Sequence, residues 1–331
     1  METRALRKNF GGHLDAVAGL DMRVEEGETF GLLGPNGAGK TTIVRMLVTL
    51  LRPTSGGASV GGFDIVKEKP KVRKVVGYLP QQLTSDDMLT GYENIQFYAK
   101  LYGLQRRLRE IRIAEALSLV GLGEASNKMV KTYSGGMKRR LELASVLVCR
   151  PRILFLDEPS LGLDPRSRNL VWDFIRKLHE SFEVTILLTT NYMDEAERLC
   201  DRVAIVDVGK VVVEGGLSQL KELVGGDVVT LKTNSQARIA EMLRGHPSVR
   251  QIEELEDETK IVLRGTGEAA IPSFITDLGN KGVEVTSVTL QKPSLDDVFT
   301  TYTGRTLKQE SPMTAPQSVR YRAKMQRREG R

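Results

Sequence analysis

Two short runs of this sequence contain residues suited to holding phosphate, and the first is Gly34–Thr41, which reads GPNGAGKT. It fits the pattern GxxxxGK(S/T), follows an apolar run with strand character, and precedes the helical run TIVRMLVTLL. In such a loop the amides of Gly37, Gly39 and Lys40 point at a β-phosphate. Lys40 also neutralises β- and γ-oxygens, and Thr41 offers a hydroxyl to Mg²⁺. A chance glycine turn is the alternative, but the flanking strand and helix favour a nucleotide site.

The second run, residues 132–140, reads TYSGGMKRR and also opens a helix. After this turn, apolar residues recur at helical spacing: Met137, Leu141, Ala144 and Val148. Glycine amides at a helix N-terminus suit a phosphate here too. The chain therefore contains two turns of this kind, about a hundred residues apart.

Two adjacent carboxylates, Asp157 and Glu158, end the apolar run ILFLDE. Successive side chains on a strand point to opposite faces, so the two carboxylates have different surroundings. Asp157 is suited to hold Mg²⁺ through water, and Glu158 is suited to polarise the water that attacks a phosphate. An acidic strand end facing solvent is the alternative interpretation. The phosphate loop in the same chain favours the catalytic one.

The elements that position these residues are predicted from hydrophobic pattern. From residue 4 to about 215, strand-like and helical runs alternate, which indicates an α/β fold around a mixed or parallel sheet. Buried strands are expected at 29–34, 153–158, 184–190 and 202–209, each followed by a turn, where such sheets place their ligands. Between about 88 and 150 helical periodicity alone remains, and this predicts an inserted helical subdomain.

A second, smaller unit is predicted from about 226 to 304, after a first unit at 1–220. The expected order is strand 227–232, helix 235–244, strands 249–255 and 259–264, helix 267–280, strand 283–290 and a closing helix 294–303. This βαββαβ order indicates a ferredoxin-like α+β domain. Residues 305–331 are expected to form a disordered basic tail. Its run RYRAKMQRR could touch anionic lipid or remain solvated.

Composition excludes several classes of protein. The net charge is +6, but after Arg305 seven basic side chains face two acidic ones, so the tail supplies most of it and a nucleic-acid-binding body is not indicated. Cys149 and Cys200 do not form a CxxC pair and are expected to be packing residues rather than metal ligands. No run approaches the roughly 20 apolar residues of a membrane span, and no signal peptide is evident. A cytosolic chain is expected, with any membrane crossing left to another polypeptide.

Four motifs together, in this order and spacing, resemble the ATP-binding subunits of the ABC type: Gly34–Thr42, Tyr133–Met137, Asp157–Pro159 and LGLD at 161–164. The resemblance covers roughly residues 4–215. It implies binding of ATP with Mg²⁺ between two subunits stacked head to tail. The nucleotide on the first loop of one subunit is then capped by Ser134, Gly135 and Gly136 of the other. The second turn is expected to serve the partner's ATP.

The resemblance assigns roles by matching position. The expected nucleotide-binding residues are Phe10, Gly34, Asn36, Gly37, Gly39, Lys40, Thr41, Thr42, Ser134, Gly135, Gly136 and Asp164. The expected metal-binding residues are Thr41, Gln81 and Asp157, and the expected catalytic residues are Glu158, Asn191 and Gln81. Phe10 would stack on adenine, with simple packing as the alternative. Gln81 would sense Mg²⁺ and meet a membrane partner, with Gln82 as its rival, and Asp164 would link the two sites of the dimer.

The sequence departs from the family pattern at two places. Tyr133 and Met137 stand where the signature usually has leucine and glutamine, which leaves the serine and glycines intact. Asn191 stands where a histidine usually contacts the γ-phosphate, and asparagine cannot carry a positive charge. Because Glu158 is retained, hydrolysis is expected to persist at a reduced rate, with Asn191 positioning rather than charging the site.

The turn YSGGM, the closing segment PSLDDVFTTYTGRT at 293–306 and the small C-terminal unit together resemble the daunorubicin and doxorubicin resistance type of drug-export ATPase. This implies an ATP-hydrolysing homodimer at the cytoplasmic face of the cell membrane, powering a separate permease, with no nucleic acid involved. A soluble ABC ATPase acting on ribosomes or DNA, or a weakly hydrolysing regulatory subunit, remains the alternative. Leu295, Val298 and Phe299 belong to a segment similar to the one that ends the regulatory domain in that group. The alternative is an amphipathic face that simply packs on the C-terminal unit, and both interpretations can hold together.

Overall fold

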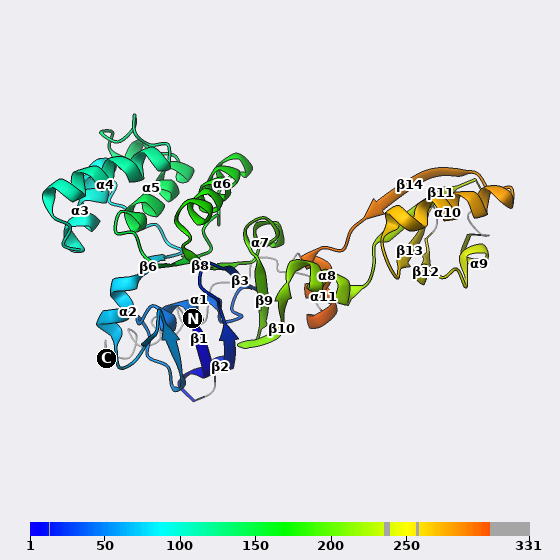
Figure 1. Cartoon of the computed structure of the whole chain (residues 1–331), viewed down its shortest axis with the longest axis horizontal. Helices are drawn as coiled ribbons and strands as arrows, with labels where there is room; N and C mark the ends of the chain where they lie inside the picture. The colour runs from blue at the N-terminus through cyan, green and yellow to red at the C-terminus, as the bar shows by residue number, and fades with distance from the viewer. Residues whose placement is uncertain (13, 235–238, 256–257, 305–331) are drawn as a thin grey trace, which may run out of the picture.

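A computed structural model describes residues 1–12, 14–234, 239–255 and 258–304 (Figure 1). The predicted basic tail at 305–331 and the first residues of the predicted helix 235–244 lie outside these ranges. Within them, no helix is both long and apolar enough to span a bilayer.

The central sheet contains six strands in the order β10-β9-β3-β8-β7-β6. Their bounds are β3 (Thr29–Leu33), β6 (Val76–Leu79), β7 (Ile153–Asp157), β8 (Thr185–Thr190), β9 (Arg202–Asp207) and β10 (Lys210–Gly216). All neighbours pair in parallel except β10, which is antiparallel to β9. Every residue of β3, β7 and β8 is buried, as expected for strands covered on both faces. The predicted mixed α/β fold is confirmed.

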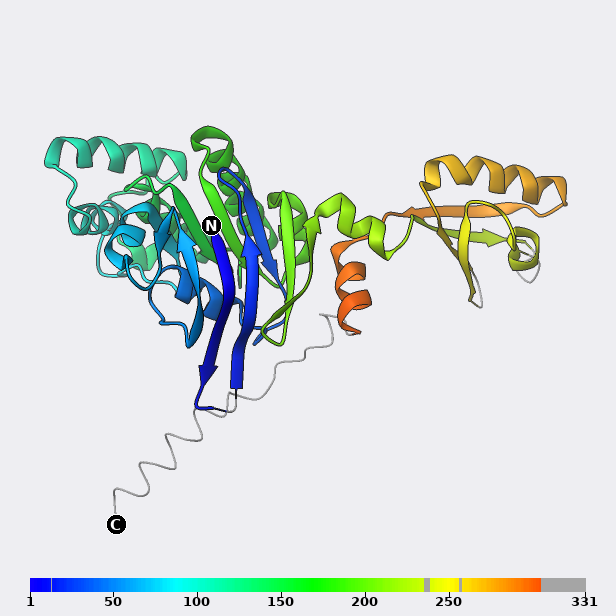
Figure 2. The ribbon, with the colours of Figure 1, turned by 60° about the horizontal axis from the view of Figure 1, so that its bottom comes forward.

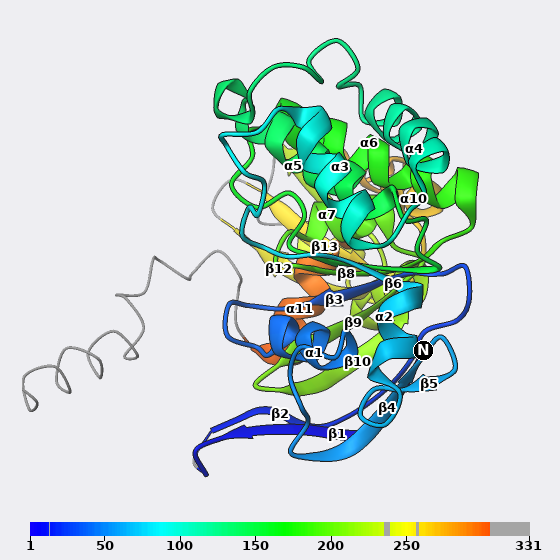
Figure 3. The ribbon, with the colours of Figure 1, turned by 90° about the vertical axis from the view of Figure 1, so that its left-hand side faces the viewer.

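Different layers cover the two faces of this sheet (Figure 3). On one face lie α1 (Lys40–Leu47) and a second sheet, in the order β2-β1-β4-β5. Its strands are β1 (Glu2–Phe10), β2 (Leu14–Arg23), β4 (Ser55–Val60) and β5 (Phe63–Asp64), followed by α2 (Lys69–Val75). On the other face lie α5 (Gly135–Leu147), α6 (Pro165–Phe182) and α7 (Met193–Leu199). Each face has its own hydrophobic core, so the turns at the strand ends rest on two rigid layers.

The predicted helical subdomain is present. It contains α3 (Gly91–Leu101), α4 (Arg106–Leu119), the 3₁₀ turn η1 (Val130–Thr132) and α5. A reciprocal cap starts α3, because the Thr90 hydroxyl accepts from the Glu93 amide while Glu93 accepts from the Thr90 amide. Ile95, Ile113 and Leu141 are buried where these helices meet the core.

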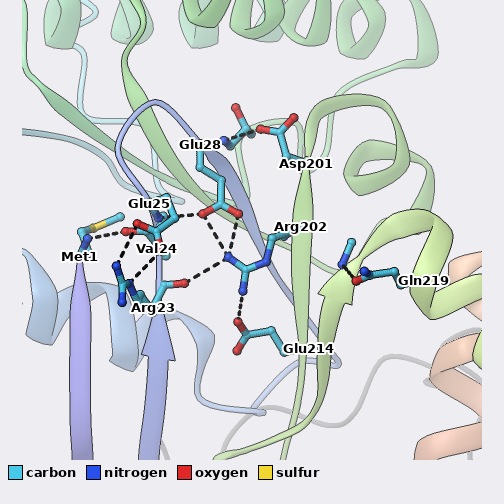
Figure 4. A network of polar contacts seen from close by, with 11 residues as sticks. Met1, Arg23, Val24, Glu25, Glu28, Asp201, Arg202, Glu214 and Gln219 are labelled. Carbon is cyan, nitrogen blue, oxygen red and sulfur yellow. Dashed lines mark hydrogen bonds and ion pairs between the residues drawn. The ribbon is translucent and has the colours of Figure 1, made fainter.

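A network around Arg202 fixes the start of β3 (Figure 4). Its guanidinium donates to Glu28 at 3.0 Å and also bonds Glu214 on β10. Next to it, the Thr29 amide donates to Asp201 at 2.8 Å. Burial raises the pKa of the Glu214 carboxyl, and Arg202 opposes that shift. These contacts join β9 and the edge strand β10 to β3, the strand that leads into the phosphate loop.

The C-terminal unit has the predicted βαββαβ order. Its elements are β11 (Val228–Thr233), α9 (Ile239–Leu243), β12 (Val249–Glu254), β13 (Thr259–Leu263), α10 (Gly267–Asn280) and β14 (Val285–Gln291). The sheet order β12-β13-β11-β14 places β11 and β13 centrally, as in a ferredoxin-like fold. A separate core with Phe274 and Leu278 stabilises it.

The closing helix α11 (Leu295–Thr303) departs from the interpretation that it packs on the C-terminal unit. It returns to the first unit and lies beside α8 (Leu217–Val224) and α7 (Figures 1 and 2). Leu295, Val298 and Phe299 are buried in the core cluster that includes Leu220 of α8. An amphipathic face predicts burial but does not specify the surface that buries it. That interpretation was therefore wrong about the partner.

The two cysteines are free, as expected for packing residues. Cys200 is buried in the core beside α7, and Cys149 packs against the same core. Burial raises the pKa of the Cys149 thiol to about 11. Within the described ranges, no group of three or more His, Cys, Asp or Glu side chains could hold a metal ion.

Candidate nucleotide site

The phosphate loop is shaped by glycines that other residues could not replace. It connects β3 to α1, and Gly39 caps the helix with φ of 104°. A Cβ atom at Gly39 would lie 2.2 Å from the Ala16 carbonyl oxygen, and one at Gly34 would lie 2.1 Å from that of Val206. The loop is thus pressed against β2 and β9, in the conformation in which amides of such a loop face an anion.

Lys40 begins α1, and its side chain is 4% exposed. Its Nζ donates to the carbonyl oxygens of Gly34 at 2.6 Å and Pro35 at 3.0 Å, and lies 3.6 Å from Oε1 of Glu158. The ammonium is therefore held across the mouth of the loop, within reach of an anion bound there.

Asp157 is fully buried at the end of β7. Its Oδ1 accepts from the Thr41 hydroxyl at 3.0 Å and from the Thr189 hydroxyl at 2.6 Å. A hydroxyl and a carboxylate thus meet beside the phosphate loop. Mg²⁺ prefers oxygen ligands of this kind, so the donor set fits that ion.

Glu158 adopts φ of 49°, an uncommon conformation for a residue with a side chain. Its amide donates to the Thr189 carbonyl at 3.0 Å, and its Oε2 accepts from Gln81 Nε2 at 2.7 Å. Burial raises the pKa of the Glu158 carboxyl above its ordinary value, and the Lys40 ammonium partly opposes this. A carboxylate of raised basicity is suited to accept a proton.

Of these groups, Lys40, Thr41, Gln81 and Glu158 line one pocket of about 360 Å³. Its lining residues are Ala16, Pro35, Asn36, Gly37, Gly39, Lys40, Thr41, Thr42, Gln81 and Glu158. A larger hollow of about 550 Å³ between α4 and the end of α6 contains none of the phosphate-loop groups. The chemistry rather than the volume therefore identifies the candidate site.

Asn191 and Phe10 were both predicted at the site, but neither lines the pocket. Asn191 follows β8, and its Oδ1 is buried without a hydrogen-bond partner among the described residues. A buried acceptor of this kind is suited to a ligand or a water molecule. Phe10, at the end of β1, is 46% exposed and lies under the Lys8 ammonium at 5.1 Å. Such exposure disfavours the alternative that Phe10 is a packing residue.

The second glycine-rich turn lies elsewhere. Ser134 caps α5, its Oγ accepting from the Met137 amide at 3.3 Å, and none of Ser134, Gly135 and Gly136 lines the pocket. A Cβ atom at Gly136 would lie 2.6 Å from Oγ of Ser167. The Ser167 amide in turn donates to Asp164 at 3.0 Å, and the Ser167 hydrogen bonds lower the pKa of Asp164. These residues therefore form a second cluster.

Ala16 and Thr189 were not expected at the site. Ala16 reaches it because the Gly39 turn approaches β2, a contact without a sequence signal. Thr189 donates to Asp157, and the pair TT before Asn191 is the only feature of the sequence that points to this contact.

Tyr133, which departs from the usual signature, is explained by its surroundings. Its side chain is buried, and its hydroxyl donates to the Ala125 carbonyl at 2.7 Å.

Comparisons with known proteins agree with this geometry. Residues 17–161 match the family model described as ABC transporter, and residues 215–303 match the C-terminal domain of DrrA1-3-like ATP-binding proteins. The chain is 42% identical over 307 residues to the daunorubicin/doxorubicin resistance ATP-binding protein DrrA of Streptomyces peucetius, covering 92% of each chain. It is 36% identical over 300 residues to the linearmycin resistance ATP-binding protein LnrL of Bacillus subtilis, covering 90% of this chain and 96% of the other.

One solved structure has a similar fold in the first unit. CbiO1 from Clostridium perfringens, part of the ABC transporter complex CbiONQ, superposes with a TM-score of 0.61 at 28% identity. The match covers 67% of this chain and 92% of that one.

Proposed function

Because this chain belongs to the ABC transporter family as an ATP-binding protein of the drug-resistance type, we propose that it hydrolyses ATP to drive a separate permease that exports drug-like amphipathic compounds. The observation that carries the proposal is that Lys40, Thr41 and Glu158 line one pocket, with Asp157 bonded to Thr41 behind them. These are a cation, a hydroxyl, a candidate base and a carboxylate, the groups that phosphoryl transfer requires.

The triphosphate would lie on the loop that contains Gly34, Asn36, Gly37, Gly39 and Thr42. Lys40 would exchange the two loop carbonyls for β- and γ-oxygens, a stronger, charge-assisted contact. Phe10 would contact the adenine ring, since nearly half of its side chain is exposed.

Thr41, Gln81 and Asp157 would hold Mg²⁺, which supplies charge neutralisation on the phosphate oxygens when bound. Because Thr41 and Asp157 already share a hydrogen bond, their oxygens start close together.

Glu158 would accept the proton of the attacking water. Gln81 holds its Oε2, which leaves Oε1, beside Lys40, as the oxygen nearer the phosphates. Asn191 would orient the same water or the γ-phosphate through its amide, whose Oδ1 has no partner among the described residues. Its contribution is a neutral hydrogen bond, so turnover is expected to be slower than with a charged imidazole.

A second copy of the chain would complete each site. Ser134, Gly135 and Gly136 would bring amides, a hydroxyl and a helix N-terminus to the partner's γ-phosphate. Asp164, tied to that turn through Ser167, would link the two sites. The dimer would work at the cytoplasmic face of the cell membrane, where the permease provides the crossing.

Uptake of a drug into membrane vesicles tests the proposal. The chain and its permease, reconstituted in inside-out vesicles, should accumulate doxorubicin when Mg-ATP is added, and Glu158→Gln should abolish accumulation. Hydrolysis that proceeds without any accumulation of this or other amphipathic dyes, together with copurifying rRNA, would instead favour the soluble ABC ATPase.

A further inference from the structure

A buried arginine outside the pocket joins segments that are far apart in the sequence. Arg139 lies in the second turn of α5 and is 3% exposed. Its Nε donates to the Pro159 carbonyl at 2.7 Å, and its Nη1 donates to the Pro80 carbonyl at 2.6 Å. Its Nη2 donates to the carbonyls of Asp157 and Glu158, both at 3.1 Å.

The charge of Arg139 is matched by Glu142, one turn further along α5. Nη1 of Arg139 lies 3.3 Å from Oε2 of Glu142, and both side chains are almost fully buried. Oε1 of Glu142 accepts from the Ser85 amide at 3.1 Å and from the Thr84 hydroxyl at 3.2 Å. The Arg139 guanidinium has five N–H donors and makes five contacts, four with backbone carbonyls and one with Glu142. All of its donors are therefore occupied by groups of this chain.

The atoms that Arg139 contacts belong to the backbone around Glu158 and Gln81. Glu158 holds a left-handed φ, which persists only where surrounding contacts enforce it. Thr189 binds its amide and Arg139 binds its carbonyl oxygen. Because Pro80 precedes Gln81, one guanidinium holds the backbone on both sides of the Gln81–Glu158 hydrogen bond.

We propose that Arg139 is a positioning residue for Glu158, and that it links the orientation of this carboxylate to the helix that begins at Ser134. The proposal rests on the proposed ATPase function. Arg139 lies five residues after Ser134 along one helix, a rise of about 7.5 Å. A tilt of α5 when Ser134 meets a partner's nucleotide therefore displaces the guanidinium, and with it the carbonyl of Glu158.

Arg139→Lys tests the positioning role in the full-length chain with its permease. Lysine keeps the charge but replaces the planar fork by a single ammonium, which cannot hold four separate carbonyls. The kcat for ATP hydrolysis should fall about 10- to 100-fold, as for a misplaced reacting group, while KM for ATP stays within about threefold.

Arg140→Lys is the matched control. Arg140 is the next residue on α5, and its Nη1 donates at 2.7 Å to the Val120 carbonyl in the helical subdomain, away from Glu158. Its kcat should stay within about twofold of the unaltered chain. The proposal would be overturned if Arg139→Lys and Arg140→Lys had equal kcat, or if Arg139→Lys only raised KM for ATP. An unaltered chain without ATPase activity would instead refute the proposed function.

Combination with Glu158→Gln separates positioning from general destabilisation. If Arg139 acts through Glu158, then Arg139→Lys causes no further loss of the residual turnover in the Glu158→Gln background. A full multiplicative loss there would overturn the proposal. Should Arg139→Lys fail to fold, Arg139→Gln/Glu142→Gln leaves no unpaired buried charge, and a kcat within about twofold of the unaltered chain would refute the role.

Discussion

The two glycine-rich turns both begin helices but have different surroundings. The first, Gly34–Thr41, contains the buried cation Lys40, lies beside Glu158 in one pocket and is bonded to Asp157 behind it. The second, Ser134–Gly136, offers amides, a hydroxyl and a helix N-terminus, and contacts α6 through Ser167. A site with its own cation can capture a triphosphate, whereas a neutral helix start can only add to the binding of one already held. The difference suggests binding by the first turn and capping by the second.

The largest effect is expected where the first turn meets its candidate base. Glu158→Gln removes the proton acceptor but keeps the Gln81 contact sterically possible, so ATP turnover should fall by about 10² to 10⁴. With Mg-ATP the variant should remain dimeric, as measured by light scattering. Glu26→Gln, at an exposed glutamate in the turn before β3, is the control. Full turnover in Glu158→Gln would remove it from the mechanism, and a strictly monomeric variant would contradict capping by a second copy.

Loss of the cation should affect binding by a single chain. Lys40→Ala removes a charge-assisted contact worth about 1.5–3 kcal/mol, so the monomer should bind ATP about 10- to 100-fold more weakly. Calorimetric titration of the monomer measures this, with the exposed Lys67→Ala as control. Unchanged affinity would mean that Lys40 remains with the carbonyls of its own loop.

The parts of the fold that the sequence predicts are those decided by local pattern. Strands such as 153–158 are apolar throughout because both faces of a parallel sheet are covered, and the glycines of Gly34–Thr41 mark a turn with one usual geometry. The βαββαβ unit was also predictable, since β11, β13 and α10 each bury one face in a regular pattern.

Other features depend on contacts between distant segments. The docking of α11 on α7 and α8 could not be predicted, since an apolar helix face predicts burial but not which surface it packs against. The left-handed φ of Glu158 likewise results from Thr189 and Arg139, which approach from other elements. Arg139 sits in the run KRR, where its two neighbours are ordinary basic residues and nothing marks it as buried.

Ser134→Ala sharpens the contrast between binding and capping. The change removes one hydrogen bond from an uncharged hydroxyl to a charged phosphate, worth about 1.5 kcal/mol, so the ATP-bound dimer should weaken about tenfold. The ATP affinity of the monomer should not change, because Ser134 does not line its own pocket. Ser294→Ala removes a similar N-cap on α11 and controls for loss of helix stability, about 1 kcal/mol. Weaker ATP binding by the Ser134→Ala monomer would show that the two turns serve one site within one chain.

The smallest effect is expected at Asn191, where the first site lacks the charge that would complete it. Asn191→His introduces an imidazole whose hydrogen bond to the γ-phosphate is charge-assisted when protonated and about 1 kcal/mol stronger, which predicts a gain in turnover of about fivefold. The imidazole is protonated below its pKa, so the gain should grow as the pH falls from about 8 to about 6. Glu158 limits this trend, because its raised pKa means that the base is neutralised at a higher pH than an ordinary carboxylate. Asn169→His, at an exposed position of α6, should show neither the gain nor its pH dependence. An Asn191→His rate that equals the unaltered rate at every pH would mean that the first turn needs no second cation, and that the neutral amide does all that this position requires.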